Sequence, residues 1–412
     1  MKETETIDTG SSWQRTLWIM AFVQCIMMMA FSSMGPFLAL YIEQLGVHDL
    51  KQVSVWAGLI ASANFIMSAI FSPIWGSVAD RKGRKLMVLR STLAISVFTC
   101  LMGLATAVWQ LLIIRILQGV FSGYSASANA LVATKIPEDR LGFALGWLAS
   151  AGMIGSLLGP LVGGIMADLV QNYRVVFFLT SSFALLAFTI TALFVKEGPM
   201  AAENARKKPT LVEQFKTIKE LKSVRSMFLV LFLTQFSVMC IQPVLPLFMK
   251  ELTNGSAYLG TVAGFAFAVT GLADLLASPF LGKRSDVLGY RKVLTICMTG
   301  AALFMLPQAF APNIWVFIAS RFGLGLFIGG IMPTANALVG RLTPKEQRGR
   351  VFGFTASATF LGSFAGPLIG GSGSALFGIR TMLVLVAILY LLNMLWIRFR
   401  VEEPTGGQKD AV

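Results

Sequence analysis

Residues 146–164 read GWLASAGMIGSLLGPLVGG and carry no charged side chain. In a helix, Gly155, Gly159 and Gly163 are spaced by four residues and therefore share one face. Because that face lacks side chains, another helix can approach it closely. Pro160 cannot donate to the carbonyl of Ser156, so it should bend the helix. The stretch predicts a smooth, bendable membrane helix with a conformational hinge made of Gly146, Gly155, Gly159, Pro160, Gly163 and Gly164.

The same pattern occurs a second time in the chain. Residues 353–371 read GFTASATFLGSFAGPLIGG, which adds Gly366 and Pro367 to the predicted hinge. The segment SPIWGSVADRKGRK at 72–85 likewise matches SPFLGKRSDVLGYRK at 278–292, with Asp80 and Asp286 206 residues apart. Parallel repeats of this kind are typical of alternating-access transporters, in which two bundles rock about a site near the middle of the membrane.

Composition indicates a membrane protein. Of the 412 residues, 55% are hydrophobic and 13% are charged, against roughly 25% charged residues in soluble domains. Twelve stretches are long and apolar enough to span a bilayer, at residues 16–41, 54–77, 86–106, 109–131, 142–167, 173–195, 226–249, 257–281, 293–311, 314–338, 351–376 and 379–399. We therefore predict an all-α polytopic membrane protein with twelve transmembrane helices in two pseudo-symmetric six-helix bundles, at residues 1–195 and 226–412.

A cytoplasmic linker at residues 196–225 joins the two predicted bundles. Thr210 and Glu213 form a capping box, and Leu211 and Phe215 begin an apolar face. Lysines beside that face would suit an anionic inner leaflet, so we expect an amphipathic surface helix that contacts membrane lipids. The alternative is a solvated linker that only joins the halves.

Charge distribution predicts the orientation. The net charge is +14, but lysine and arginine gather in alternate loops and not on one face, which argues against nucleic-acid binding. This bias places both termini in the cytoplasm. Residues 1–12 are polar and acidic, so we expect no cleaved signal peptide. The four cysteines lie in apolar stretches and His48 is the single histidine, so we expect no metal site, no cofactor and no enzyme.

Three motifs now identify a family. The loop from Gly76 to Lys85, the sequence from Arg115 to Gly119, and the stretch 146–164 together resemble the major facilitator superfamily. The last of these resembles the fifth-span motif of its drug:proton antiporter branch. The resemblance implies a monomeric secondary exporter in the inner membrane of a bacterium, which exchanges protons for small amphipathic or drug-like compounds by alternating access.

The loop after the second span is the expected cytoplasmic gate. Its glycines permit a tight turn, and its carboxylate can accept from a helix N-terminus or pair with an arginine. The resemblance implies that this contact latches the cytoplasmic side shut; the alternative is an ordinary basic loop. The gate residues are Gly76, Asp80, Arg81, Gly83, Arg84, Lys85 and Asp286.

Two charged residues inside spans are candidates for proton coupling. Asp274 is the only acidic residue well inside a span, and a carboxylate at that depth could bind and release a proton. The resemblance implies that Arg115 helps this coupling. The alternatives are a neutral or paired acid and a structural arginine bound to carbonyls or Gln118. The first span has no acid between Trp13 and Tyr41, which departs from many proteins of the branch.

The first and seventh spans should line the substrate cavity. Methionine and phenylalanine offer a surface that adapts to varied ligands, and amides add uncharged hydrogen bonds; the alternative is that these residues face lipid or neighbouring helices. The candidates are Gln24, Met27, Met28, Phe31, Asn64, Gln118, Gln235 and Gln242. Glu43 and Asp168 lie at outer helix ends and are expected on the surface.

Other functions remain to be separated from this one. The chain has no P-loop, so an ion gradient and not ATP should drive it. The nearest alternative is a dedicated exporter of one metabolite such as a siderophore or sugar. A membrane enzyme would need a cluster of nucleophilic groups at one depth, and a channel would need no repeated glycine helices.

Overall fold

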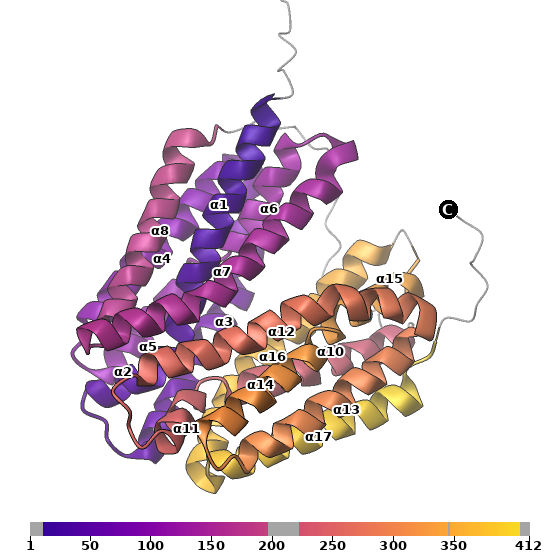
Figure 1. The fold of residues 1–412 in the computed structure, drawn as a ribbon. Coiled ribbons are helices and arrows are strands. Elements are labelled where there is room, and N and C mark those ends of the chain that lie inside the picture. The colour runs from indigo at the N-terminus through magenta and orange to yellow at the C-terminus, as the bar shows by residue number, and fades with distance from the viewer. Residues whose placement is uncertain (1–10, 197–221, 345–346, 404–412) are drawn as a thin grey trace, which may run out of the picture.

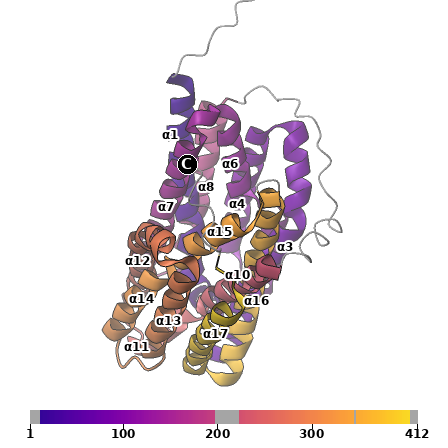
Figure 2. The ribbon, with the colours of Figure 1, turned by 90° about the vertical axis from the view of Figure 1, so that its right-hand side faces the viewer.

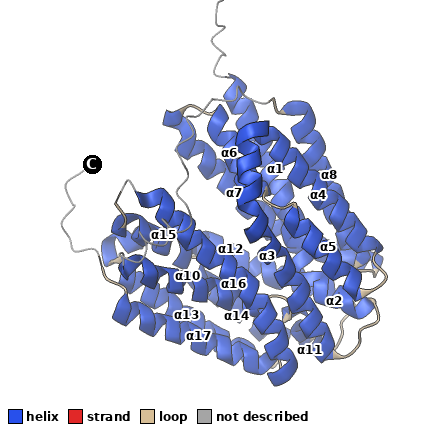
Figure 3. Cartoon of the chain, turned by 180° about the vertical axis from the view of Figure 1, so that it is seen from behind, coloured by secondary structure: helices blue, strands red, loops and turns tan. Residues whose placement is uncertain are grey.

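The computed structural model describes residues 11–196, 222–344 and 347–403, and these residues contain helices and no strand (Figure 3). Twelve of the helical segments are long and apolar enough to cross a membrane. This confirms the predicted all-α fold with twelve spans.

The helices follow the predicted spans closely. In the first half they are α1 Ser11–Met34, η1 Gly35–Phe37, α2 Leu38–Gln44, α3 Leu50–Lys82, α4 Arg84–Leu104, α5 Val108–Val120, α6 Tyr124–Lys135, η2 Glu138–Arg140, α7 Leu141–Val170 and α8 Arg174–Phe194. In the second half they are α10 Lys222–Ile241, α11 Leu245–Leu252, α12 Leu259–Leu288, α13 Tyr290–Ala309, α14 Ile314–Ile328, α15 Ile331–Leu342, α16 Arg348–Phe377 and α17 Ile379–Arg400.

The two halves form two bundles that lie side by side (Figure 1). They meet where α7 packs on α12 and α16 packs on α3, and Figure 2 shows α3 and α16 next to each other. The bundles diverge toward α6 and α15. We call the end with α2 and α11 the closed end, and the end with α6 and α15 the open end.

Helices α3 and α12 run five to seven residues past the predicted ends of their spans, to Lys82 and Leu288. Hydropathy ends a span at the first charged residues, but a helix can continue into water. The positive charges of Arg81 and Lys82 also stabilise the last turn of α3, because they lie at the negative end of the helix dipole. Gly83 and Gly289 then end the two helices with φ of +96° and +93°, a conformation that favours glycine.

Four spans that the sequence predicted as continuous are interrupted in the structure. The first is interrupted by η1 at 35–37 and the seventh by a turn at 242–244, while the fourth breaks at 121–123 and the tenth at 329–330. Pro36 and Pro243 take matching places in the two repeats and lack the N–H that would continue the helix. Broken helices inside a membrane are tolerated where they line a cavity.

The glycine face of α7 packs inside its own bundle. A Cβ atom at Gly155 would overlap the carbonyl oxygen of Cys25 on α1, and one at Gly159 would overlap Ser32 and Met29 on the same helix. The second repeat does the same, with Gly362, Gly366 and Gly370 of α16 against α10. This stripe therefore joins helices within a bundle, through the close approach that a face without side chains allows.

A second face of each glycine helix forms the contact between bundles. Gly164 of α7 lies against Gly260 of α12, where a Cβ atom would overlap the carbonyl oxygen of Gly260. The carbonyl of Pro160 fills the space beside Gly264 in the same way. In the other crossing, Gly371 and Pro367 of α16 lie against Ser54 and Gly58 of α3. The conformational role of these residues stays a prediction.

The predicted linker helix lies outside the described residues, because 197–221 are not among them. Helix α8 ends at Phe194 and α10 begins at Lys222, so the predicted domain division stays a prediction.

Gly155→Val should destabilise the protein, whereas Gly146→Val should not. The new side chain at Gly155 collides with the backbone of α1, and overpacking typically costs about 1–3 kcal/mol. No atom lies within 4 Å of a Cβ atom at Gly146, so the matched variant should melt like the wild type. Thermal unfolding in detergent checks both; equal melting temperatures would contradict the close packing of α1 on α7.

Candidate functional site

A cavity of about 400 Å³ lies between the two bundles. Both bundles contribute to its wall: α1, η1, α2, α3, α5 and α7 of the first, and α10, α11, α12, α13, α14, α16 and α17 of the second. Residues predicted for the substrate cavity, for proton coupling and for the hinge lie together in this wall. They are Phe31, Asn64, Arg115, Pro160, Gln242, Asp274 and Pro367.

Asp274 supplies the carboxylate of the cavity. It lies on α12 and is half-buried. Within the part of the chain that the structure describes, its side chain makes no hydrogen bond or ion pair. The break between α14 and α15 lies beside it, since a Cβ atom at Gly329 would come within 2.8 Å of Oδ1 of Asp274. The carboxylate thus faces a packed helix break on one side and the cavity on the other.

Arg115 is buried at the wall of the cavity, with 6% of its surface exposed. Its Nη1 donates to Oε1 of Gln118 at 3.0 Å, and Nε2 of Gln118 donates to Oγ1 of Thr99 at 3.0 Å. Nε of Arg115 has no hydrogen-bond partner among the described residues. The contact with Gln118 is the one expected for a structural arginine, but Arg115 also faces the cavity, so its role in coupling stays a prediction.

Arg321 occupies the matching place in the second bundle, on α14. It is 9% exposed, lies over the ring of Phe267 at 5.1 Å from its centroid, and lines the cavity. Gln308 and Tyr390 line the same wall, and Oε1 of Gln308 and the hydroxyl of Tyr390 lack partners in the described chain. Gln308 and Tyr390 were missed from the sequence. Their polarity inside the ninth and twelfth spans was the available signal.

The chemistry of this wall follows from its charges. Two guanidinium groups are permanently charged, whereas the carboxylate of Asp274 can gain or lose a proton. Most of the remaining lining is apolar, including Phe65 and Met305. Such a cavity can hold an amphipathic molecule. The charge of the cavity wall changes by one unit when Asp274 gains or loses a proton.

Other predicted cavity residues lie elsewhere. Met27 is 1% exposed in the core of the first bundle, and Met28 packs against that core. Gln24 faces α7, where a Cβ atom at Gly152 would come within 3.1 Å of its Nε2. These three residues precede Phe31 by three to seven positions and lie on the same side of α1, but at their level that side is covered by α7 and by the core of the bundle. Gln118 lies behind Arg115 and bonds to it.

Gln235 lines a second cavity of about 400 Å³, whose wall comes mostly from the second bundle. Its Nε2 donates to Oγ of Ser363 at 3.1 Å. Phe65 borders both cavities, so the second cavity adjoins the first.

The predicted gate residues lie at the open end of the first bundle. Arg84 donates from Nη1 to the carbonyl of Ala130, and Lys85 donates from Nζ to the carbonyl of Ala192, each at 2.9 Å. Arg81 is exposed, and a Cβ atom at Gly76 would meet open space. The side chain of Asp80 lies outside the described part of the structure.

Asp286 is the repeat counterpart of Asp80. Arg341 approaches it to 3.5 Å, and the hydroxyl of Tyr290 donates to it. Both partners belong to its own bundle. A latch between bundles at this end therefore stays a prediction, because the bundles are apart there (Figure 1).

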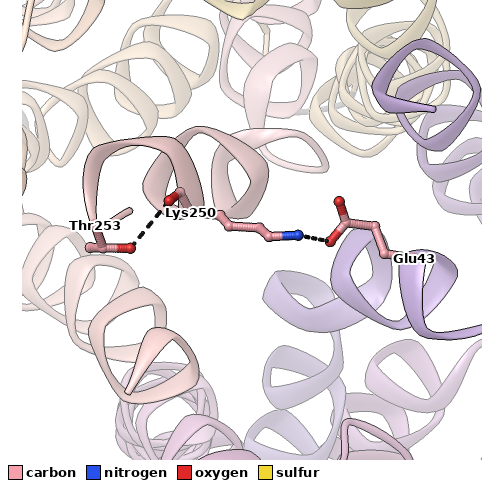
Figure 4. Close-up of polar contacts among 3 residues, drawn as sticks. All are labelled: Glu43, Lys250 and Thr253. Atoms are coloured by element: carbon pink, nitrogen blue, oxygen red, sulfur yellow. Dashed lines mark hydrogen bonds and ion pairs between the residues drawn. The ribbon is translucent and has the colours of Figure 1, made fainter. Parts of the chain in front are cut away.

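Glu43 and Asp168 do more than lie on the surface, which corrects the expectation. Lys250 of α11 donates to Oε2 of Glu43 on α2 at 2.8 Å and joins the bundles at the closed end (Figure 4). Both oxygens of Asp168 accept from the first turn of α12. Burial, and then the charges of Asp168 and Glu43, raise the pKa of nearby Tyr173 to about 12, so its phenol stays neutral.

Comparison with known proteins places this geometry in a family. The family model described as Major Facilitator Superfamily matches residues 20–260 and 227–412. The chain is 38% identical over 395 residues to the "Multidrug resistance protein MdtG" of Enterobacter lignolyticus, covering 94% of this chain and 93% of that protein. It is 37% identical over 392 residues to the protein of the same name from Escherichia fergusonii, covering 94% and 95%.

Solved structures share the fold at low identity. The nucleoside transporter NupG superposes with a TM-score of 0.80 at 11% identity, covering 93% of this chain and 98% of that one. A bacterial homologue of the human lysosomal transporter Spinster, in an inward-facing and occupied conformation, superposes with a TM-score of 0.77 at 14% identity, covering 94% and 96%.

Asp274 should react with dicyclohexylcarbodiimide, which modifies carboxyl groups in apolar surroundings. It lines the cavity and its carboxylate is free of partners in the described chain. Asp168, whose two oxygens both accept hydrogen bonds, should stay unmodified. Mass spectrometry of the peptides checks this, and Asp274→Asn should lose the adduct. An adduct on Asp168 and none on Asp274 would contradict the assignment.

Proposed function

The chain belongs to the major facilitator superfamily, and from this premise we propose that it is a secondary exporter of small amphipathic, drug-like compounds that works by proton antiport. The observation that carries the proposal is the cavity between the bundles, with the partner-free carboxylate of Asp274 in its wall. The relatives described above align with 94% of this chain and are named multidrug resistance proteins, which supports drug-like compounds as the substrate class.

Proton coupling rests on Asp274. A carboxylate in a largely apolar cavity favours its protonated form unless a cation stands close by. Movement of either arginine toward Asp274 would favour release of the proton. Substrate in the cavity and a proton on Asp274 can thus influence each other, since both occupy the same wall. This is the physical requirement for exchange of one against the other.

Alternating access is supported by how the bundles meet. They touch at two glycine crossings near the closed end and diverge at the open end. Backbone surfaces without side chains can separate and rejoin without repacking long side chains. The basic residues Arg81, Lys82 and Arg341 lie at the open end, which makes it the cytoplasmic end under the positive-inside rule. The conformation is then open to the cytoplasm.

Proton release should follow substrate addition to energised inside-out vesicles, and Asp274→Asn should abolish it. The panel should hold cationic, neutral and anionic compounds, because the wall carries two arginines and one aspartate. Asp139→Asn is the matched control, since the side chain of Asp139 is 73% exposed and Asp139 does not line the cavity. Release that persists in Asp274→Asn would keep the antiporter and remove Asp274 as its proton carrier.

Overproduction should raise the resistance of a sensitive bacterial host to several chemically unrelated compounds, and Arg115→Ala should remove most of that gain. Loss of Arg115 breaks the buried contact with Gln118 and takes one fixed charge from the wall. Minimum inhibitory concentrations measure the effect, with membrane levels of both proteins compared. Resistance to one compound alone would favour the dedicated metabolite exporter.

A further inference from the structure

The first turn of α12 receives its cap from the other bundle. Tyr258, the residue before the helix, provides no side-chain cap. Instead, the N–H of Gly260 donates to Oδ1 of Asp168 at 2.8 Å and the N–H of Thr261 donates to Oδ2 at 2.6 Å. These are N–H groups that a helix cannot pair within itself. A carboxylate on α7 therefore satisfies the backbone of α12 across the interface.

Glycine makes room for this contact. A Cβ atom at Gly260 would lie 2.6 Å from Oδ1 of Asp168 and 2.8 Å from the carbonyl oxygen of Gly164. A side chain there would push the carboxylate away from the backbone that it caps. The glycine crossing and the cap thus form one contact between the bundles.

The repeat lacks this cap at the other crossing. Ala375 of α16 takes the place that Asp168 has in α7, and it offers no side-chain acceptor. Helix α3 is capped by its own Asp49, which accepts from the N–H of Lys51 at 3.3 Å. Among the described residues, one crossing is therefore held by packing, and the other also by a helix cap that exists only while the bundles touch.

We infer that Asp168 is a positioning residue that holds the closed end shut and so sets the ratio of the two conformations of the transport cycle. This rests on the proposed alternating-access function. When α7 and α12 separate, Gly260 and Thr261 lose their acceptor and α12 loses its cap. The ion pair of Glu43 with Lys250 acts in the same direction, but more weakly, because the lysine side chain is 46% exposed.

The test measures how often the cavity opens at the closed end. Ser156 lines the cavity, and Ser156→Cys in a background without the four native cysteines gives one reporter thiol. A membrane-impermeant maleimide added to right-side-out vesicles reaches that thiol only through the closed end. Asp168→Ala should raise the labelling rate about five-fold. Loss of a helix cap typically costs about 1 kcal/mol, and about 1.4 kcal/mol corresponds to a ten-fold change in an equilibrium. Asp168→Asn keeps one acceptor oxygen and should raise it about two-fold.

Asp49→Ala is the matched control. It removes a helix cap of the same chemistry, but within one bundle, so it should lower the melting temperature without changing the labelling rate. A merely structural Asp168 would behave in the same way. Labelling of Asp168→Ala at the wild-type rate, in protein that melts as a folded species, would overturn the inference. If Asp168→Ala does not fold, the wild-type rate in folded Asp168→Asn would overturn it.

The result is independent of substrate and proton transport, because labelling requires neither. A raised labelling rate in Asp168→Ala, together with no drug efflux by the wild type, would support the latch and reject the drug-export proposal. A rate that rises only in inside-out vesicles would support the latch and reverse the proposed orientation.

Discussion

Direct contact between helix backbones at two glycine crossings is the constraint on which this structure depends. At both crossings a Cβ atom would overlap a carbonyl of the facing helix. Lipid provides no hydrophobic force between helices, so close packing and hydrogen bonds have to hold the bundles together. Because these contacts involve few side chains, the bundles can meet over a small area and leave a cavity between them. The position of the cavity thus follows from where the glycines lie.

The cavity wall carries two arginines and one aspartate. Burying a guanidinium group is costly, and each bundle lowers that cost differently. Gln118 accepts from Arg115, whereas Arg321 lies over the ring of Phe267. Neither arginine has a carboxylate within ion-pair distance in the described chain. Asp274 is the acid of the same wall, so its protonation changes the balance of charge that a substrate meets.

The two halves are similar in backbone structure but differ in their polar side chains. Both halves break their first and fourth spans at matching places, and both place a glycine helix at the contact between bundles. Polar chemistry does not follow this symmetry. Asp274 has Ser68 as its repeat counterpart, and Asp168 has Ala375. The two halves therefore share a backbone framework but carry different polar side chains at matching positions.

The sequence by itself determined the twelve spans, the repeat and the family, because a bilayer demands about 20 apolar residues per crossing and a repeat preserves its glycines. It also singled out Asp274, Arg115, Phe31, Asn64 and Gln242, which the cavity brings together. Only the tertiary structure decided which face each residue takes. Hydropathy of a buried helix is nearly the same on all sides, so it could not show that Met27 lies in a core, that Tyr390 lines the cavity, or that Asp168 caps a helix of the other bundle. Those facts depend on how two helices distant in sequence cross, and no local pattern encodes that crossing.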